Sequence, residues 1–217
     1  MEPDAIEIRV VGCLIEKQRA TPDAYPLSLN SLRLACNQAT NRDPVVDYDE
    51  ATVSDALRRT ALRGWTRLSS GAGSRARKYR QLLNEALDLD EAEISLLGVL
   101  MLRGPQTPGE LKQRSERLHS FESLAAVDET LARLVERGHV ARQERRPGQK
   151  EQRYEQLLGG GGEAGQGETP TATPAVGAAA PAVAASGESE GTRLDRLERE
   201  LSELRDEVRA LREALGE

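Results

Sequence analysis

The sequence predicts a mainly helical protein with small β-hairpins, and three features of its 217 residues support this fold class. A repeat divides residues 1–158 into two similar segments. In each segment, apolar residues at helical spacing are followed by short strands with glycine between them. Residues 193–217 carry apolar residues at the 3.5-residue period of a coiled coil.

The repeat predicts two copies of one structural unit, residues 1–88 and residues 89–158. Four pairs of short segments match: Val11–Leu14 with Leu97–Leu100, Thr21-Pro22 with Thr107-Pro108, Val53–Gly64 with Val127–Gly138, and Lys78–Leu83 with Arg153–Leu158. The third pair reads VSDALRRTALRG and VDETLARLVERG, and the fourth reads KYRQLL and RYEQLL.

Three helices are expected in each unit. In the first unit, helical spacing of Ile6, Val10, Cys13 and Leu14 predicts the first helix. Leu29–Cys36 is the expected second helix, with Ser28 or Asn30 as its cap. The third helix carries apolar residues at i, i+3, i+4, i+7 and i+8 in both units: Val53, Ala56, Leu57, Thr60 and Ala61, then Val127, Thr130, Leu131, Leu134 and Val135.

A β-hairpin is expected after each third helix, which Gly64 or Gly138 ends. The first strand is Trp65–Leu68 or His139–Arg142, and the second strand ends in Leu-Leu. The turns between them contain Gly71 and Gly73 or Pro147-Gly148. Three helices and a hairpin wing make a winged helix, so we expect two winged-helix domains in tandem.

Residues Gly12–Val45, GCLIEKQRATPDAYPLSLNSLRLACNQATNRDPV, resemble the signature of the YceH family, as do Met101–His119 and the RYEQLL segment. The motif that carries the resemblance consists of Cys36, Asn37, Gln38, Asn41, Arg42 and Pro44. The likeness covers about residues 4–158 and implies two tandem winged-helix domains. The biochemical role of this bacterial family is not established, so the resemblance implies no activity.

Composition argues against several classes of function. Two cysteines without a CxxC pair and two histidines give neither a disulfide scaffold nor a zinc finger, and we expect no metal or cofactor. No apolar run is long enough for a membrane helix, and the acidic N-terminus lacks the basic flank of a signal peptide. We therefore expect a soluble cytoplasmic protein that does not contact membranes.

No catalytic constellation is found, so we expect that the protein is not an enzyme. Cys13 lies on the apolar stripe of the first helix, and Cys36 has no histidine near it in sequence, which favours packing roles for both. His119 and His139 lack the spacing of metal ligands. Asn41 and Arg42 either belong to a polar binding patch or hold the second helix and the following loop through hydrogen bonds.

Double-stranded DNA is the expected partner. The net charge of -6 resides in residues 159–217, which carry six basic and twelve acidic residues. Between Ala56 and Asn84 there is no acidic residue, and the basic ones are the candidate DNA contacts: Arg58, Arg59, Arg63, Arg67, Arg75, Arg77, Lys78 and Arg80. The expected role is that of a DNA-binding, regulatory protein.

The N-terminal end of the third helix argues against base reading. This end would approach the base edges, yet it carries Asp47, Asp49, Glu50 and Asp55, which phosphate repels. The basic residues follow on the wing, which favours backbone contact. The alternative is a protein–protein scaffold without DNA binding, resembling the tandem winged-helix segregation protein B.

The C-terminal region predicts a linker and a self-associating helix. Residues 159–192 are rich in Gly, Ala and Pro and are expected to be disordered. Residues 193–217 then predict a coiled coil whose core positions are Leu194, Leu197, Leu201, Leu204, Val208, Leu211 and Leu215. In a parallel homodimer, its flanking charged residues would pair with opposite sign. The alternative is an isolated amphipathic helix folded back on the body.

Overall fold

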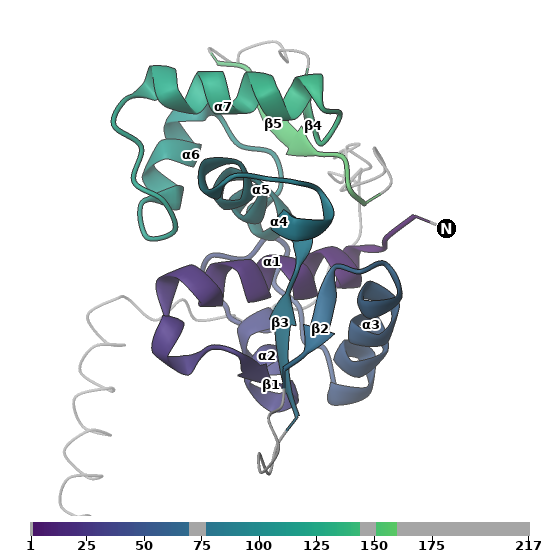
Figure 1. Ribbon diagram of the computed structural model, residues 1–217. Coiled ribbons are helices and arrows are strands. Elements are labelled where there is room, and N and C mark those ends of the chain that lie inside the picture. Colours follow the sequence, from purple (N-terminus) through teal and green to yellow (C-terminus); the bar gives the residue numbers. More distant parts are fainter. Residues whose placement is uncertain (1, 70–76, 144–150, 160–217) are drawn as a thin grey trace, which may run out of the picture. The chain divides into compact units, whose positions relative to one another are not determined.

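The computed structural model describes residues 2–69, 77–143 and 151–159, in which two successive sets of helices and strands follow the same order (Figure 1). We call residues 2–88 the first half and residues 89–159 the second half. The first half contains α1 (Ala5–Ala20), η1 (Pro22–Ala24), β1 (Leu27–Ser28), α2 (Leu29–Cys36), α3 (Glu50–Leu62), β2 (Thr66–Leu68), β3 (Lys78–Gln81) and α4 (Leu83–Ala86). The second half contains α5 (Glu91–Arg103), α6 (Pro108–Ser115), α7 (Leu124–Glu136), β4 (Val140–Arg142) and β5 (Tyr154–Gln156).

The described chain is mainly helical with small antiparallel hairpins, as the sequence predicts, and this arrangement is consistent with a winged helix. In the first half, β1 joins the hairpin to give the strand order β1-β3-β2, with Leu27 opposite Tyr79. In the second half, β4 pairs with β5, and Gln106 forms a single bridge to Tyr154. Strand β1 was not predicted because two residues are too short to show a period.

The cap of α2 was predicted, whereas the caps of α1 and α5 were not. Ser28 caps α2 by accepting a hydrogen bond from the Ser31 N–H, so Ser28 rather than Asn30 is the cap. Asp4 and Asp90 begin α1 and α5 with complete capping boxes.

The glycines predicted to end the third helices have the required backbone conformation. The φ values of Gly64 and Gly138 are 75° and 71°, a region that disfavours side chains.

The structure corrects two details of the repeat. Ala61 is exposed and Val135 is 38% exposed, so the core side of each third helix ends one position earlier than the apolar pattern predicts. The equivalent of Thr107 is Ser28 rather than Thr21, because Thr107 caps α6 as Ser28 caps α2, whereas the Thr21 side chain forms no capping hydrogen bond.

Helices α1 and α5 join the two halves through two glycines. A Cβ on Gly12 would lie 3.1 Å from the Met101 Cβ, and a Cβ on Gly98 would lie 2.9 Å from the Ile15 Cγ2. The repeat aligns Gly12 with Gly98 and Ile15 with Met101, so the two contacts are equivalent. Ile8, Val11 and Ile15 of α1 consequently belong to the same buried cluster as residues of α5 and α7.

Replacing Gly98 by alanine is expected to lower the free energy of unfolding by about 1–2 kcal/mol, because overpacking outweighs the gain in helix propensity. Urea denaturation of the full chain measures the change. Gly109→Ala is the matched control, since its nearest neighbour across space, the Thr107 Oγ1, would be 4.0 Å from the new Cβ. Equal stability of the two variants would contradict the close-packing argument.

Several predicted features lie outside the described residues: the glycine-containing turns, Arg75, the linker and the C-terminal coiled coil. Within the described residues, no helix combines the length and apolarity needed to cross a membrane.

Candidate nucleic-acid interface

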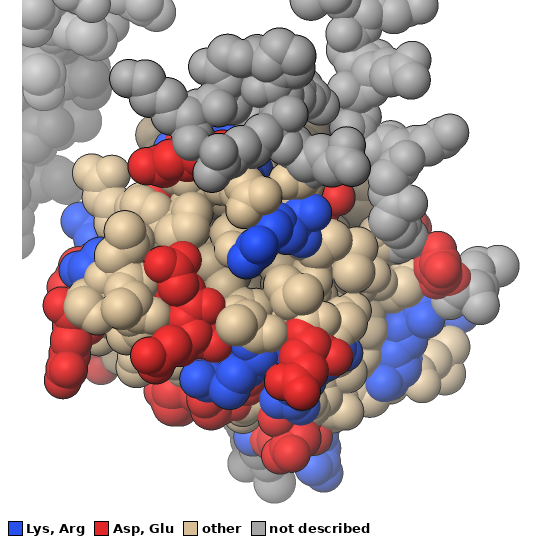
Figure 2. Space-filling view, turned by 90° about the horizontal axis from the view of Figure 1, so that it is seen from above, with Lys and Arg blue, Asp and Glu red and all other residues tan. Residues whose placement is uncertain are grey.

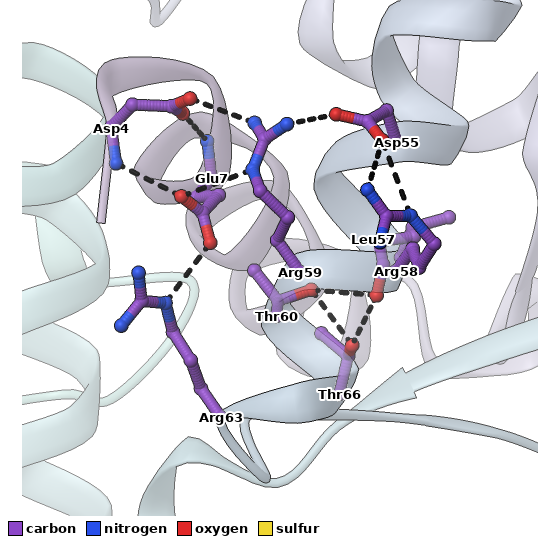
Figure 3. Close-up of polar contacts among 9 residues, drawn as sticks. All are labelled: Asp4, Glu7, Asp55, Leu57, Arg58, Arg59, Thr60, Arg63 and Thr66. Atoms are coloured by element: carbon purple, nitrogen blue, oxygen red, sulfur yellow. Dashed lines mark hydrogen bonds and ion pairs between the residues drawn. The ribbon is translucent and has the colours of Figure 1, made fainter. Parts of the chain in front are cut away.

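Two of the arginines predicted to contact DNA belong to an ion-pair network on the first half (Figure 3). Arg59 of α3 binds Asp4 at 2.7 Å, Glu7 at 3.4 Å, and Asp55. Arg63 donates from Nε to Glu7 Oε1 at 3.1 Å. Burial by itself raises the pKa of the Glu7 carboxyl, but the Asp4 N–H and the two arginines lower it below its ordinary value.

The second half contains the same network. Arg133 of α7 binds Asp90 at 2.8 Å and Glu93 at 3.3 Å, and Arg137 binds Glu93 at 3.1 Å. Glu7 and Glu93 are both almost fully buried, with 2% and 3% of their surface exposed. The network therefore ties the start of the first helix to the third helix in each half, and Arg59 and Arg63 have a structural role.

The hairpin of the first half presents basic side chains on one face. Arg67 of β2 lies directly opposite Arg80 of β3, and Lys78 lies two residues from Arg80, on the same face of the strand. The neighbouring pair, Thr66 and Gln81, is buried, so the arginines face away from the core. The exposed face of this hairpin therefore carries three positive charges.

Acidic partners compensate this face only in part. Arg80 lies 3.7 Å from Glu85, whereas Arg67 and Arg77 form no ion pair within the described part of the chain. Arg58 is more fully compensated, because it binds Asp55 at 2.8 Å. Arg67 and Arg77 are thus available for an anionic partner, and Lys78 and the partly compensated Arg80 lie beside them on the same hairpin.

The acidic residues before and within α3 have structural contacts. Asp49 caps α3 by accepting from the Thr52 N–H at 2.7 Å, and this hydrogen bond lowers the pKa of its carboxyl. Asp47 accepts from the Asn37 side chain at 3.2 Å. The hydrogen bond from Arg58 lowers the pKa of Asp55. These contacts account for Asp47, Asp49 and Asp55, three of the four acidic residues at this helix end, without a ligand.

The family-motif residues hold the loop between α2 and α3. The Asn37 side chain donates to Tyr48 O at 2.8 Å and accepts from Tyr48 N at 2.9 Å. Arg9, only 4% exposed, donates to Cys36 O and to Pro44 O. The motif thus fastens this loop to α1 and α2.

Arg42 is the centre of this loop and uses all five of its N–H donors. Its Nε donates to Ala35 O at 3.0 Å, and Nη1 donates to Glu16 Oε1 at 3.1 Å and Asn41 O at 2.8 Å. Its Nη2 donates to Glu16 Oε2 at 2.6 Å and Gln38 Oε1 at 2.9 Å. The Arg42 side chain is fully buried, so these contacts match the structural alternative for this residue.

Asn41 has a backbone conformation that few residues adopt. Its φ is 61°, a region in which asparagine is among the better tolerated residues. Its side-chain oxygen accepts a hydrogen bond from Arg103 of the second half. Asn41 therefore connects the loop of the first half to the end of α5.

The two cysteines lie together in the core of the first half. Cys13 and Cys36 are fully buried, as the packing interpretation predicts. The hydrogen bond with Cys13, together with burial, raises the pKa of the Cys36 thiol. Among the described residues, no group of three His, Cys, Asp or Glu side chains is placed to hold a metal ion.

In the described strands of the second hairpin, the basic face of the first hairpin is not repeated. The residues equivalent to Arg67 and Arg80 are Ala141 and Glu155, which lie opposite each other between β4 and β5. Figure 2 views the chain from the side on which α7 lies in Figure 1, and there acidic and basic side chains are intermingled. Among the described strand residues, the pair of opposed arginines is therefore specific to the first hairpin.

Sequence reasoning missed the acidic partners of Arg59 and Arg63. The signal was present, because Asp4-x-x-Glu7 and Asp90-x-x-Glu93 both fit a capping box and occupy equivalent positions of the repeat. Sequence distance hid the contact, since Arg59 lies 55 residues from Asp4.

Comparison with known proteins identifies relatives along nearly the whole chain. The family described as "Protein of unknown function, DUF480" matches residues 4–149. A UPF0502 protein of Solibacter usitatus is 45% identical over 93% of this chain and 92% of its own length. A UPF0502 protein of Cronobacter sakazakii is 40% identical over 98% of this chain and 97% of its own length. The resemblance drawn from the motif is thereby confirmed, and the chain belongs to the DUF480 family.

Proposed function

We propose that residues 1–158 form two tandem winged-helix domains and that the first binds the backbone of double-stranded DNA through its hairpin. The observation that carries the proposal is the pair formed by Arg67 and Arg80. Like charges directly opposite each other on neighbouring strands are unfavourable. The equivalent pair in the second hairpin, Ala141 and Glu155, indicates that this hairpin fold does not require two arginines at these positions. A polyanionic partner would compensate the excess charge.

Backbone contact is a better fit to the charges than base reading. The start of α3 carries Asp49 and Glu50, whose negative charge would oppose entry of this helix end into the major groove. The basic hairpin supports contacts that position a duplex without selecting its sequence. We therefore propose DNA binding with little sequence preference and, from it, a regulatory role.

The alternative is a protein–protein scaffold, and exposed leucines favour it. Leu62 at the end of α3 is 79% exposed, and Leu68 of β2 is 49% exposed. The two leucines belong to α3 and to β2, which contact each other, and contiguous exposed apolar side chains can form part of a protein-binding surface. The two proposals differ in whether a bare duplex binds.

Fluorescence anisotropy with a labelled random-sequence duplex tests DNA binding by the full chain. With four contacts, from Arg67, Arg77, Lys78 and Arg80, the logarithm of affinity should fall with the logarithm of salt at a slope of about −3.6. Duplexes of different sequence should bind alike. Absence of binding at low salt would reject this function and favour the scaffold.

We also propose a parallel homodimer through residues 193–215. The support is the uninterrupted apolar register of the sequence, because these residues lie outside the described ones. Three heptads are marginal alone, so the dimer should be weak and concentration-dependent. Sedimentation should show the full chain dimerising at tens of micromolar, while a chain ending at Leu158 stays monomeric. If both chains sediment as monomers at this concentration, the homodimer is rejected.

A further inference from the structure

A polar hollow of about 290 Å³ lies where the two halves meet. The first half contributes Asn41 and Arg42 from the loop between α2 and α3, and the second half contributes residues from the end of α5, from α6 and from the segment before β5. Those that matter most are Arg103, Gln106, Glu110, Arg114 and Arg153. The hollow is separate from the basic hairpin, none of whose residues line it.

Positive charge exceeds negative charge around this hollow. The buried charge of Arg42 is balanced by Glu16, so Arg42 has no donor left for a ligand. Glu110 binds both Arg114, at 3.6 Å, and Arg153, at 3.0 Å. Besides Arg42, the hollow is lined by three arginines, Arg103, Arg114 and Arg153, and Glu110 is the carboxylate that contacts two of them. The exposed Asp43 also lines the hollow.

Arg103 is the least compensated of these arginines. Its side chain donates to the neutral Asn41 oxygen and forms no ion pair with a described residue, although the charges of Glu16 and Glu110 act to raise its pKa. Burial, followed by the charges of Arg114 and Arg42, lowers the pKa of Arg103. A ligand with negative charge would relieve this repulsion and replace lost solvation.

Gln106 lines the hollow and has one side-chain acceptor without a partner among the described residues. It is 4% exposed, and its Nε2 donates to Arg103 O at 3.0 Å and Pro105 O at 2.9 Å. Its Oε1 is buried and has no hydrogen-bond partner among the described residues. Buried polar atoms without partners are rare, and a ligand N–H or O–H would satisfy this one.

We propose that this hollow binds a small organic anion whose phosphate or carboxylate group lies beside a hydroxyl or amino donor. Arg103, Arg114 and Arg153 bind the anionic group, and the donor hydrogen-bonds to the Gln106 Oε1. Gln106 pairs through its backbone with Tyr154 of β5, while Asn41 belongs to the first half. The ligand thus contacts the second half next to its hairpin, at a site that Asn41 of the first half also lines.

Isothermal titration calorimetry of the full chain, without DNA, tests the proposal with three probes. Glycerol 3-phosphate supplies a phosphate with hydroxyl donors, malate supplies carboxylates with a hydroxyl, and inorganic phosphate supplies the anion alone. We expect saturable binding of at least one hydroxylated probe, tighter than that of inorganic phosphate. Failure of all three to bind saturably at millimolar concentration overturns the proposal.

Two variants and a control assign the binding to this hollow. Arg103→Met should lower the affinity for the bound probe about tenfold or more, because it removes a charge-assisted contact. Gln106→Met should lower the affinity for the hydroxylated probe and leave the affinity for inorganic phosphate unchanged. Arg117→Met removes an exposed arginine that does not line the hollow, and it should bind like the parent protein. Equal binding by all three folded variants overturns the proposal.

Discussion

Replacing Arg42 by methionine should lower the free energy of unfolding by about 3–5 kcal/mol, because the change removes one partner of a buried ion pair. Glu16, whose side chain is 13% exposed, would lose its two hydrogen bonds from the guanidinium. The carbonyls of Ala35 and Asn41 would each lose the same donor group. Urea denaturation followed by circular dichroism measures this loss.

Two further variants separate the charge from the packing. Arg42→Met/Glu16→Leu removes both charges and should be more stable than Arg42→Met alone, because no uncompensated carboxylate remains. Arg142→Met is the matched control for losing an arginine, since Arg142 lies over the Tyr154 ring and makes no ion pair among the described residues. Its stability should change by about 0.5 kcal/mol or less. A double variant as unstable as Arg42→Met would contradict this account.

The ion pair between Arg42 and Glu16 should also make the free energy of unfolding depend on pH in acid. Burial by itself raises the pKa of Glu16, but hydrogen bonds and charge from Arg42, together with Lys17, lower it below its ordinary value of 4.5. A lowered pKa in the folded state means that the ionised carboxylate stabilises the fold above that ordinary value. This contribution is lost as pH falls through the lower, folded-state pKa. Glu16→Gln should therefore flatten the acid side of the stability profile.

The helices and hairpins were predictable because local chemistry determines them. Apolar spacing placed α3 and α7, Ser28 marked the start of α2, and Gly64 and Gly138 marked helix ends. Strand β1 was missed because it depends on pairing with β3, which lies about fifty residues later in the chain.

The candidate interface was only partly predictable because charge balance is set in three dimensions. The run from Ala56 to Asn84 has no acidic residue in sequence, yet Asp4 and Glu7 of α1 neutralise Arg59 and Arg63 across the fold. Arg67 and Arg80 could not be singled out, since their register depends on a turn whose length and geometry do not follow from composition. The hollow at Gln106 likewise combines loops from both halves.

Removing Arg67 and Arg80 together should weaken duplex binding about 100-fold at about 50 mM salt, because two phosphate contacts are lost. The slope of log affinity against log salt should fall from about −3.6 to about −1.8. The variant Arg67→Ala/Arg80→Ala should remain folded, because the equivalent hairpin carries Ala141 and Glu155 at these positions. Removing the repulsion between the two arginines should even favour the hairpin slightly.

The decisive comparison is with a variant that loses the same charge elsewhere. Arg117→Ala/Arg142→Ala removes two positive charges from the second half and should keep both the affinity and the salt slope of the parent protein. If net charge alone governed binding, the two double variants would lose affinity equally, and the hairpin would have no special role. A reciprocal change, Ala141→Arg/Glu155→Arg, installs the like-charged pair on the second hairpin. In the second hairpin, Arg153 occupies the position of Lys78 but is already paired with Glu110, and Gln152 occupies the position of Arg77. The gain in affinity should therefore be smaller than the loss at the first hairpin.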